Sequence, residues 1–179
     1  SRKGWGFESP PSQSEASMRE IDTIQIGPAE STDADAAEGI TREAFDGVSI
    51  DQAIERLVGP LPGVRWGDVK SHSVRVQFEQ TPQRCLVARL QDGRVVGFVT
   101  TRDQVAGLRG RIADLAVAAD FRGRGLGRRL IDAAVEMLRQ AGYRQVQIET
   151  LESNPVGRHL YPRMGFREVA RQLYYAKEL

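Results

Sequence analysis

Apolar residues recur along the chain at spacings that predict an alternation of strands and helices. Where every second residue is apolar, or where a short apolar run lies between turn residues, a strand is expected. Asp92-Gly93, between two such runs, is typical of a β-hairpin turn. The predicted strands are residues 19–27, 73–79, 84–90, 95–101, 111–117 and 145–151, with one or two more in 166–179.

Apolar residues three or four positions apart predict four helices, at residues 28–45, 49–59, 125–141 and 155–164. Ser49 and Asn154 precede two of them as N-caps, and Gly59 and Gly142 follow two as C-terminal glycines. The Pro- and Gly-rich stretch 60–73 is expected to be irregular. An antiparallel meander followed by strand, helix and strand predicts a mixed α/β sheet.

The chain of 179 residues is long enough for one domain, expected over residues 19–179. Residues 1–18 are rich in Ser and Pro and are expected to be a flexible tail or an expression remnant, with Met18 as a native start. Cys85 is the single cysteine, so no internal disulfide can form. The longest apolar run, Leu115 to Ala119, is far too short to span a bilayer, and a cytoplasmic protein is expected.

The net charge of +1 argues against a general binder of polyanions. The charge is unevenly distributed, since residues 1–60 hold twelve acidic and five basic side chains, a net charge of −7, and the remainder therefore carries +8. No aromatic residues alternate with the basic ones, so a nucleic acid is not an expected partner.

The most informative stretch is DFRGRGLGRRL, residues 120–130, between a predicted strand and a predicted helix. Glycines let a backbone approach an anion closely, a helix N-terminus presents free N–H groups, and arginines add charge. The stretch is not a P-loop, because Arg128 and Arg129 follow Gly127 where Lys and Ser or Thr are needed. It also lacks the third glycine of a dinucleotide loop. A solvated helix start is the alternative to a phosphate site.

Two segments in the right order resemble the GNAT superfamily of N-acyltransferases. Arg122-x-x-Gly125-x-Gly127 follows Asp114-Leu115-Ala116-Val117 and resembles that family's acyl-CoA loop. Further on come Glu149, Asn154, Leu160-Tyr161 and Gly165-Phe166, similar to its closing pattern. The likeness covers about residues 95–175. It implies a mostly antiparallel sheet of six to seven strands with about four helices, and a splay between two central parallel strands.

By this resemblance, backbone N–H groups from Gly123 to Arg128 hold the pyrophosphate of coenzyme A. The end of the preceding strand pairs with the pantetheine arm, and a backbone N–H there polarises the thioester carbonyl. The residues implied to bind the cosubstrate are Leu115, Ala116, Val117, Arg122, Gly123, Arg124, Gly125, Leu126, Gly127, Arg128 and Asn154.

Tyr161 matches the family tyrosine that donates or positions a proton for the departing thiolate, with a packing tyrosine on a short helix as the alternative. Glu149 is the candidate base, with a solvated strand carboxylate as the alternative. Asp114 is a second candidate base or a structural hydrogen-bond acceptor. Of the two histidines, His72 could contact substrate and His159 is expected to be exposed.

Two histidines far apart and one cysteine do not predict a metal site. Cys85 is expected in the core, which argues against an acyl-cysteine intermediate. The resemblance therefore implies an acetyl-CoA-dependent N-acetyltransferase that works by direct attack of an amine in a ternary complex. A non-catalytic acyl-CoA-binding module is the alternative. The acceptor amine and a homodimer are left open.

Overall fold

The computed structural model describes residues 23–179. The expected tail at 1–18 lies outside the described residues, as does Ile21 of the first predicted strand. One five-stranded sheet has the order β1-β2-β3-β4-β5 and is antiparallel from β1 to β4, while β4 and β5 run parallel. The strands are β1 (Gln25–Pro28), β2 (Cys85–Arg89), β3 (Val95–Val105), β4 (Arg109–Val117) and β5 (Gln145–Ile148).

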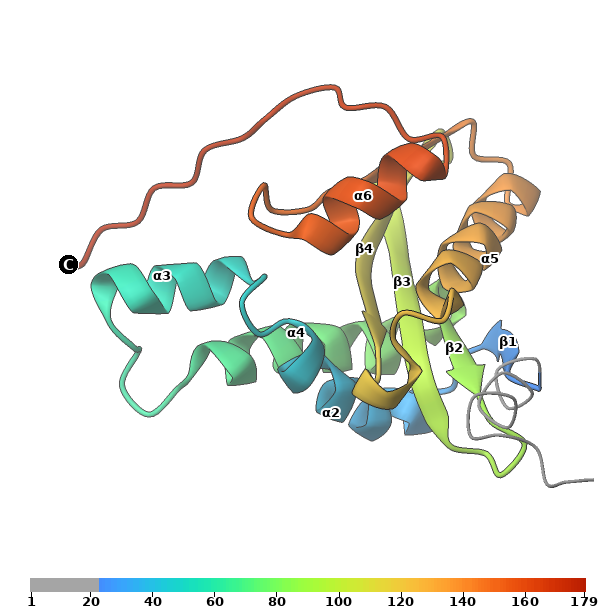
Figure 1. Ribbon diagram of the computed structural model, residues 1–179, viewed down its shortest axis with the longest axis horizontal. Helices are drawn as coiled ribbons and strands as arrows, with labels where there is room; N and C mark the ends of the chain where they lie inside the picture. The colour runs from blue at the N-terminus through green and yellow to red at the C-terminus, as the bar shows by residue number, and fades with distance from the viewer. Residues whose placement is uncertain (1–22) are drawn as a thin grey trace, which may run out of the picture.

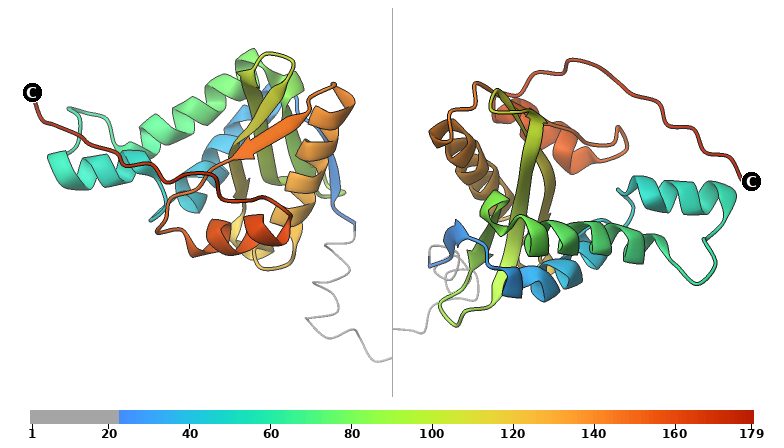
Figure 2. Two further views of the ribbon diagram at one scale, coloured as in Figure 1. Left: turned by 90° about the horizontal axis from the view of Figure 1, so that it is seen from above. Right: turned by 180° about the vertical axis from the view of Figure 1, so that it is seen from behind.

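Helices cover both faces of this sheet, as the two views in Figure 2 show. The amphipathic helix α5 packs its apolar side, including Leu130 and Ile131, on one face. Helices α2 and α4 pack on the other, where Val74 and Phe78 of α4 meet Phe98 of β3. The helices are α2 (Ala34–Ala44), α3 (Ile50–Val58), α4 (Trp66–Gln80), α5 (Leu126–Gln140) and α6 (Pro155–Arg163), with short 3-10 turns η1 (Ser31–Asp33), η2 (Pro82–Arg84) and η3 (Ala119–Phe121) (Figure 1).

Strand β4 contains a β-bulge that determines which side chains point to each face of the sheet. Thr100 of β3 pairs with Asp114, but the next residue, Thr101, pairs with Ile112, so Ala113 is an extra residue without a partner on β3. Such a bulge reverses the alternation of side chains. Ile112 and Leu115 therefore both face α5, while Asp114 faces α4.

The predicted strand at 73–79 is wrong, because these residues belong to helix α4. Val74 and Phe78, taken for alternate strand positions, are also four residues apart and form one buried stripe with Ser71. The helix begins at Trp66 within the stretch expected to be irregular. Arg65 precedes it, and its backbone N–H donates to the Asp68 carboxylate at 3.1 Å, which closes the first turn.

The expected six or seven strands are also corrected to five. Residues 166–179 form no strand, and no backbone hydrogen bond joins residues 167–179 to any other described residue. Consequently β5 lies at the edge of the sheet instead of near its centre. The segment is rich in Val, Leu and Tyr, which favour strands, but a strand forms only where a neighbouring strand supplies hydrogen bonds.

The buried carboxylate of Asp114 joins β4 to α4 directly beside the bulge. It is 5% exposed and accepts hydrogen bonds from Gln77 Nε2 at 2.7 Å and Thr100 Oγ1 at 3.4 Å, and it forms an ion pair with Lys70. The Lys70 ammonium in turn lies 4.4 Å from the centre of the Phe45 ring. Each member of this polar cluster depends on the carboxylate, since a buried charge is costly unless it is paired.

We predict that Asp114→Ala lowers the free energy of unfolding by about 3 kcal/mol, because it leaves the Lys70 ammonium without its carboxylate and removes the shorter of the two hydrogen bonds that Gln77 Nε2 donates. Urea denaturation measures the change. Asp35→Ala is the control, because its carboxylate also pairs with a basic residue, Arg75, but is 85% exposed, and it should change stability little. Equal losses in the two variants would contradict the role given to Asp114.

Candidate functional site

At two positions in the loop between β4 and α5, the backbone has a conformation that only glycine adopts easily. Gly123 has φ 73° and Gly125 has φ 81°, both in the left-handed region. Gly125 is the N-cap residue of α5, and the first hydrogen bond of that helix runs from Arg129 N to the Gly125 oxygen at 3.1 Å. The two glycines turn the chain sharply from the strand end into the helix.

Six successive backbone N–H groups in this loop have no hydrogen-bond partner among the described residues. They belong to residues 123–128, which end in the first turn of α5. Helix α5 has no acidic residue in its first turn and no side-chain cap, so no carboxylate of its own neutralises the positive end of the helix dipole. This arrangement is suited to bind an anion such as phosphate.

Gly127 differs from Gly123 and Gly125, because its backbone conformation does not call for glycine. Its φ is not positive, and a Cβ built on it would meet no heavy atom within 4 Å. A glycine inside a helix costs about 1 kcal/mol relative to alanine. Neither backbone conformation nor packing requires a glycine here, and the missing side chain leaves the neighbouring N–H groups open to a bulky anion.

The arginines of the loop divide into two pairs. Arg122 Nε donates to the Val117 oxygen at 2.8 Å, and Arg129 donates to the Ile24 oxygen at 2.6 Å, so these two tie the loop and helix to the strands. Arg124 and Arg128 are exposed. Arg128 Nε lies 3.9 Å from the Asp132 carboxylate in an exposed ion pair one helical turn apart, and Arg124 has no ion-pair partner among the described residues. Arg122 is exposed as well and contacts Glu43 at 3.6 Å, so what distinguishes Arg124 and Arg128 is that neither donates to a backbone oxygen of the described chain.

Beyond the bulge, β4 separates from its parallel neighbour. The two strands pair from Arg109 with Gln145 to Ile112 with Ile148, although β4 continues to Val117. Leu115, Ala116 and Val117 therefore have a backbone edge that no strand covers among the described residues. Leu126, by contrast, buries its side chain in the core and can offer a ligand only its backbone N–H.

Helix α6 borders this gap on the α5 side of the sheet. Tyr161 packs against the same apolar cluster as α5, with its ring 6.2 Å from that of Phe166. Burial raises the pKa of its hydroxyl, so the group stays protonated at neutral pH. Asn154 caps the helix, since its Oδ1 accepts from the backbone N–H groups of Val156 at 3.1 Å and Gly157 at 3.3 Å. Gly157 lets α6 lie close to Thr150, where a Cβ would come within 2.5 Å of its hydroxyl.

Glu149 follows directly after β5 and forms an ion pair with Arg111 of β4. Arg111 stands between Gly110 and Ile112, which both face α5, so its side chain projects to the opposite face. Burial, reinforced by the charge of nearby Arg102, lowers the pKa of this guanidinium, and its Nε has no hydrogen-bond partner. Tyr161 and Glu149 thus lie on opposite sides of the gap between β4 and β5.

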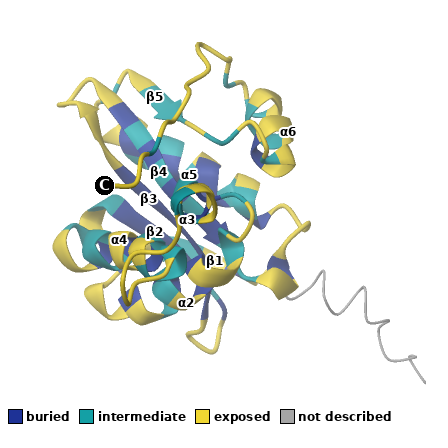
Figure 3. Cartoon of the chain, turned by 90° about the vertical axis from the view of Figure 1, so that its left-hand side faces the viewer, coloured by how far each residue is buried: buried dark blue, intermediate teal, exposed yellow. Residues whose placement is uncertain are grey.

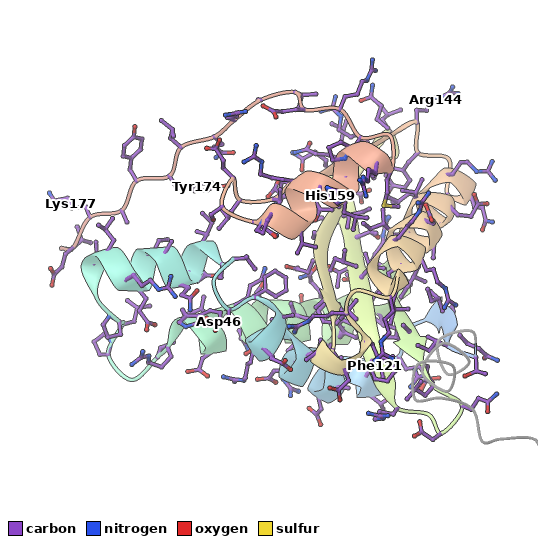
Figure 4. The ribbon with its side chains drawn as sticks, viewed as in Figure 1. Asp46, Phe121, Arg144, His159, Tyr174 and Lys177 are labelled. Atoms are coloured by element: carbon purple, nitrogen blue, oxygen red, sulfur yellow. The ribbon has the colours of Figure 1, made fainter. Side chains whose placement is uncertain are left out.

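The remaining candidates lie outside this gap. His72 is exposed on α4 and His159 is exposed on α6, where Figure 4 labels it. Cys85 is 1% exposed and burial raises the pKa of its thiol to about 12, which opposes a role as a nucleophile at neutral pH. In the described part of the chain no group of three His, Cys, Asp or Glu residues could hold a metal, and no helix there is long and apolar enough to cross a membrane.

Sequence reasoning missed Lys70 and Arg111. Lys70 lies in the stretch 60–73 that the sequence predicts to be irregular, and no local pattern distinguishes Arg111 from the other arginines. The pairing of each with an acidic residue far away in sequence, Asp114 and Glu149, is visible only once the chain is folded.

Comparison with known proteins decides the family. Residues 52–166 match the model of the acetyltransferase (GNAT) family. The chain belongs to this family. The resemblance found in its loop and closing segment is thereby confirmed.

Two curated relatives match this chain at about 30% identity but over different lengths. A mycothiol acetyltransferase from Propionibacterium freudenreichii subsp. shermanii is 30% identical over 150 residues, which cover 80% of this chain and 48% of the relative. The chain thus spans about half the length of that protein. N-alpha-acetyltransferase 30 from Schizosaccharomyces pombe is 31% identical over 104 residues, covering 56% of this chain and 69% of the relative.

Among solved structures, the PaiA N-acetyltransferase from Thermoplasma acidophilum, crystallised in complex with coenzyme A, has a TM-score of 0.64 to this chain at 18% identity. The match covers 80% of this chain and 89% of that structure. At this identity the likeness shows the fold, a mixed α/β sheet of the GNAT type.

Proposed function

We propose that this protein transfers the acetyl group of acetyl-CoA to a primary amine by direct attack in a ternary complex. The observation that carries the proposal is the row of six free backbone N–H groups at residues 123–128, beside the free edge of β4, in a chain of the acetyltransferase family. The pyrophosphate of coenzyme A would lie on the N–H groups, near Arg124 and Arg128. The pantetheine arm would follow Leu115 to Val117 into the gap.

The two faces of the sheet give the reactants separate routes. The amine nitrogen would approach from the α4 side and attack the thioester carbonyl carbon, which forms the C–N bond and a tetrahedral oxyanion; the C–S bond would break when this intermediate collapses. Glu149, on that side, would take the proton from the amine, directly or through water. Tyr161, on the α5 and α6 side, would give its proton to the departing thiolate. Backbone N–H groups at the free edge of β4 would stabilise the oxyanion.

A non-catalytic acyl-CoA-binding module is the competing proposal, because the loop alone would suffice to bind the cosubstrate. Release of free thiol from acetyl-CoA, measured over a panel of small amines, polyamines and peptides, separates the two. Peptides with free N-termini belong in the panel because one relative is named an N-alpha-acetyltransferase. Binding of acetyl-CoA without thiol release for any amine would favour the module.

We predict that Gly127→Ala has opposite effects on stability and binding. It should raise the stability of the free protein by up to about 1 kcal/mol, because alanine is the better helix former and its Cβ meets no atom. It should weaken acetyl-CoA binding about tenfold or more, because the methyl group holds the phosphate away from the N–H groups. Thermal unfolding with and without acetyl-CoA measures both effects.

Gly39→Ala is the matched control, since Gly39 is an exposed helical glycine in α2 with no atom within 4 Å of a built Cβ. It should give a similar gain in stability with unchanged affinity. If Gly127→Ala binds acetyl-CoA as tightly as the control does, the cosubstrate lies elsewhere.

Tyr161→Phe should lower kcat by about 10²–10⁴-fold, the usual contribution of a general acid, with little change in acetyl-CoA affinity. The raised pKa of Tyr161 places the loss of its proton above the ordinary value of 10, so the wild-type rate should fall only at strongly alkaline pH. The variant should lack that alkaline limb. Pre-steady-state turnover is the appropriate measurement, because slow product release would mask the chemical step. A variant as fast as wild type would make Tyr161 a packing residue.

Glu149→Gln should lower kcat/KM for the amine about 10²-fold or more at neutral pH, because an amide cannot accept the proton. The defect should shrink as the pH rises and more of the amine is already neutral. Glu152→Gln is the control, since Glu152 is a nearby exposed carboxylate that is also paired with an arginine, at 2.8 Å. A defect of the same size at every pH would instead assign Glu149 a positioning role.

A further inference from the structure

Three arginines project from the α4 side of the sheet near Glu149. Arg109 and Arg111 of β4 lie on either side of Gly110, which faces α5, so both point to the opposite face. Arg102 of β3 pairs in register with Arg111, and residues that pair in register share a face. This is the side from which the acceptor amine is proposed to approach.

The carboxylates of this face do not balance the three arginines. Asp114 forms its ion pair with Lys70 of α4. Glu149 pairs with Arg111, and no ion pair joins the other two arginines to a described residue. The surface beside Glu149 therefore carries a net positive charge.

Arg102 and Arg111 stand opposite each other on neighbouring strands. Side chains paired in this way start about 5 Å apart, and like charges directly opposite each other are unfavourable. Burial, and then the charge of Arg102, lower the pKa of the Arg111 guanidinium, so the two groups do interact. Arg102 is exposed and makes no hydrogen bond or ion pair with the described chain. An anion held between the two guanidinium groups would replace their repulsion with two attractions.

Arg111 has donors left for such an anion. A guanidinium carries five N–H donors, whereas Glu149 is the one ion-pair partner of Arg111 among the described residues. The Arg111 side chain is 20% exposed, so its surroundings hold it in place while part of it still reaches the surface. It can therefore pair with Glu149 on one side and with a second anion on the side of Arg102.

Small molecules can reach this end of the sheet from solvent. In Figure 3, β5 lies at the edge of the sheet away from α2 and α4. The side chain of Glu149 is 46% exposed, and Arg102 is exposed as well. The C-terminal segment passes in front of this end of the sheet, and its Tyr174 lies near Arg111. A tyrosine hydroxyl can also donate a hydrogen bond to an anion.

We propose that Arg102 and Arg111 form an anion subsite for the acceptor, so that the acceptor is an amine that also carries a carboxylate or a phosphate. The inference rests on the proposed function and names the substrate class of the same site. The amine would lie at Glu149 and the anionic group between the two arginines. Because Arg111 contacts both Glu149 and the subsite, a short linker between amine and anion suffices. A second ammonium group in place of the anion would be repelled.

A matched set of small acceptors tests the charge of the far end. γ-Aminobutyrate, its carboxamide and the corresponding diamine have similar lengths, but their far ends are negative, neutral and positive at neutral pH. We expect kcat/KM, followed by thiol release from acetyl-CoA, to fall in that order, by about tenfold between acid and amide. An aminoalkyl phosphate of the same length shows which anion is preferred. Equal kcat/KM for acid and amide, with this and with shorter and longer linkers, overturns the proposal.

Arg102→Gln should remove the preference for the acid. Arg102 has no partner in the described chain, so the variant keeps the fold, and the ratio of kcat/KM for acid over amide should fall to about one. Arg109→Gln is the matched control, because Arg109 is an exposed arginine of the same face that already donates to Gln145 Oε1 at 2.9 Å, nearer the start of β4. The control should keep the wild-type ratio. A preference that survives Arg102→Gln, or that both variants lose equally, contradicts the subsite.

Binding separates this inference from the proposed reaction. Calorimetric titration of the acid and of the amide into the protein, with coenzyme A present, measures affinity without turnover. If no amine releases thiol, the proposed reaction fails, but the acid should still bind about tenfold more tightly than the amide and lose this advantage in Arg102→Gln. Equal affinities of acid and amide for the wild-type protein overturn the anion subsite, whatever the result of the thiol-release assay.

Discussion

The bulge at Ala113 is the constraint on which both the fold and the candidate site depend. It reverses the alternation of β4, so that Ile112 and Leu115 both enter the core under α5 while Asp114 turns toward α4. Without the extra residue, the carboxylate and the leucine would exchange faces. Burying an unpaired carboxylate is prohibitive, whereas here Lys70, Gln77 and Thr100 satisfy it. The polar cluster thereby locks the bulge in place.

The separation of β4 from β5 begins at the same point. Pairing ends at Ile112, and the next residue is the bulge. The strand edge that β5 leaves uncovered at residues 113–117 is followed by a short 3-10 turn with its own hydrogen bonds, and then by the six free N–H groups of residues 123–128. Six successive free N–H groups at the start of a helix, close to an uncovered strand edge, are the strongest structural reason to assign an anionic ligand to this region.

The division of the loop arginines shows how composition alone misleads about a charged segment. Four arginines in eleven residues suggest a uniform basic patch, yet Arg122 and Arg129 donate to the backbone oxygens of Val117 and Ile24. These two bonds hold the loop and helix in place, while Arg124 and Arg128 donate to no backbone oxygen of the described chain. Tyr161 and Glu149 lie on opposite faces of the sheet. Tyr161 is on α6, which packs on the α5 side, whereas Glu149 pairs with Arg111 on the other side.

The sequence by itself determined the features that depend on local chemistry. The glycine loop, the Asn154 cap of α6, the hairpin at Asp92-Gly93 and the family followed from residue types at short spacing, because turns and caps are satisfied by their immediate neighbours. Ser49 stands at the predicted N-cap position of α3, but its side chain makes no capping hydrogen bond. Helix α4 was missed because Val74 and Phe78 fit both a strand and a helix, and only packing against Phe98 chooses between them. The free C-terminal segment, the bulge and the pairs Lys70–Asp114 and Arg111–Glu149 required the tertiary structure. Each of these depends on partners that are distant in the chain, and no local pattern records which distant groups will meet.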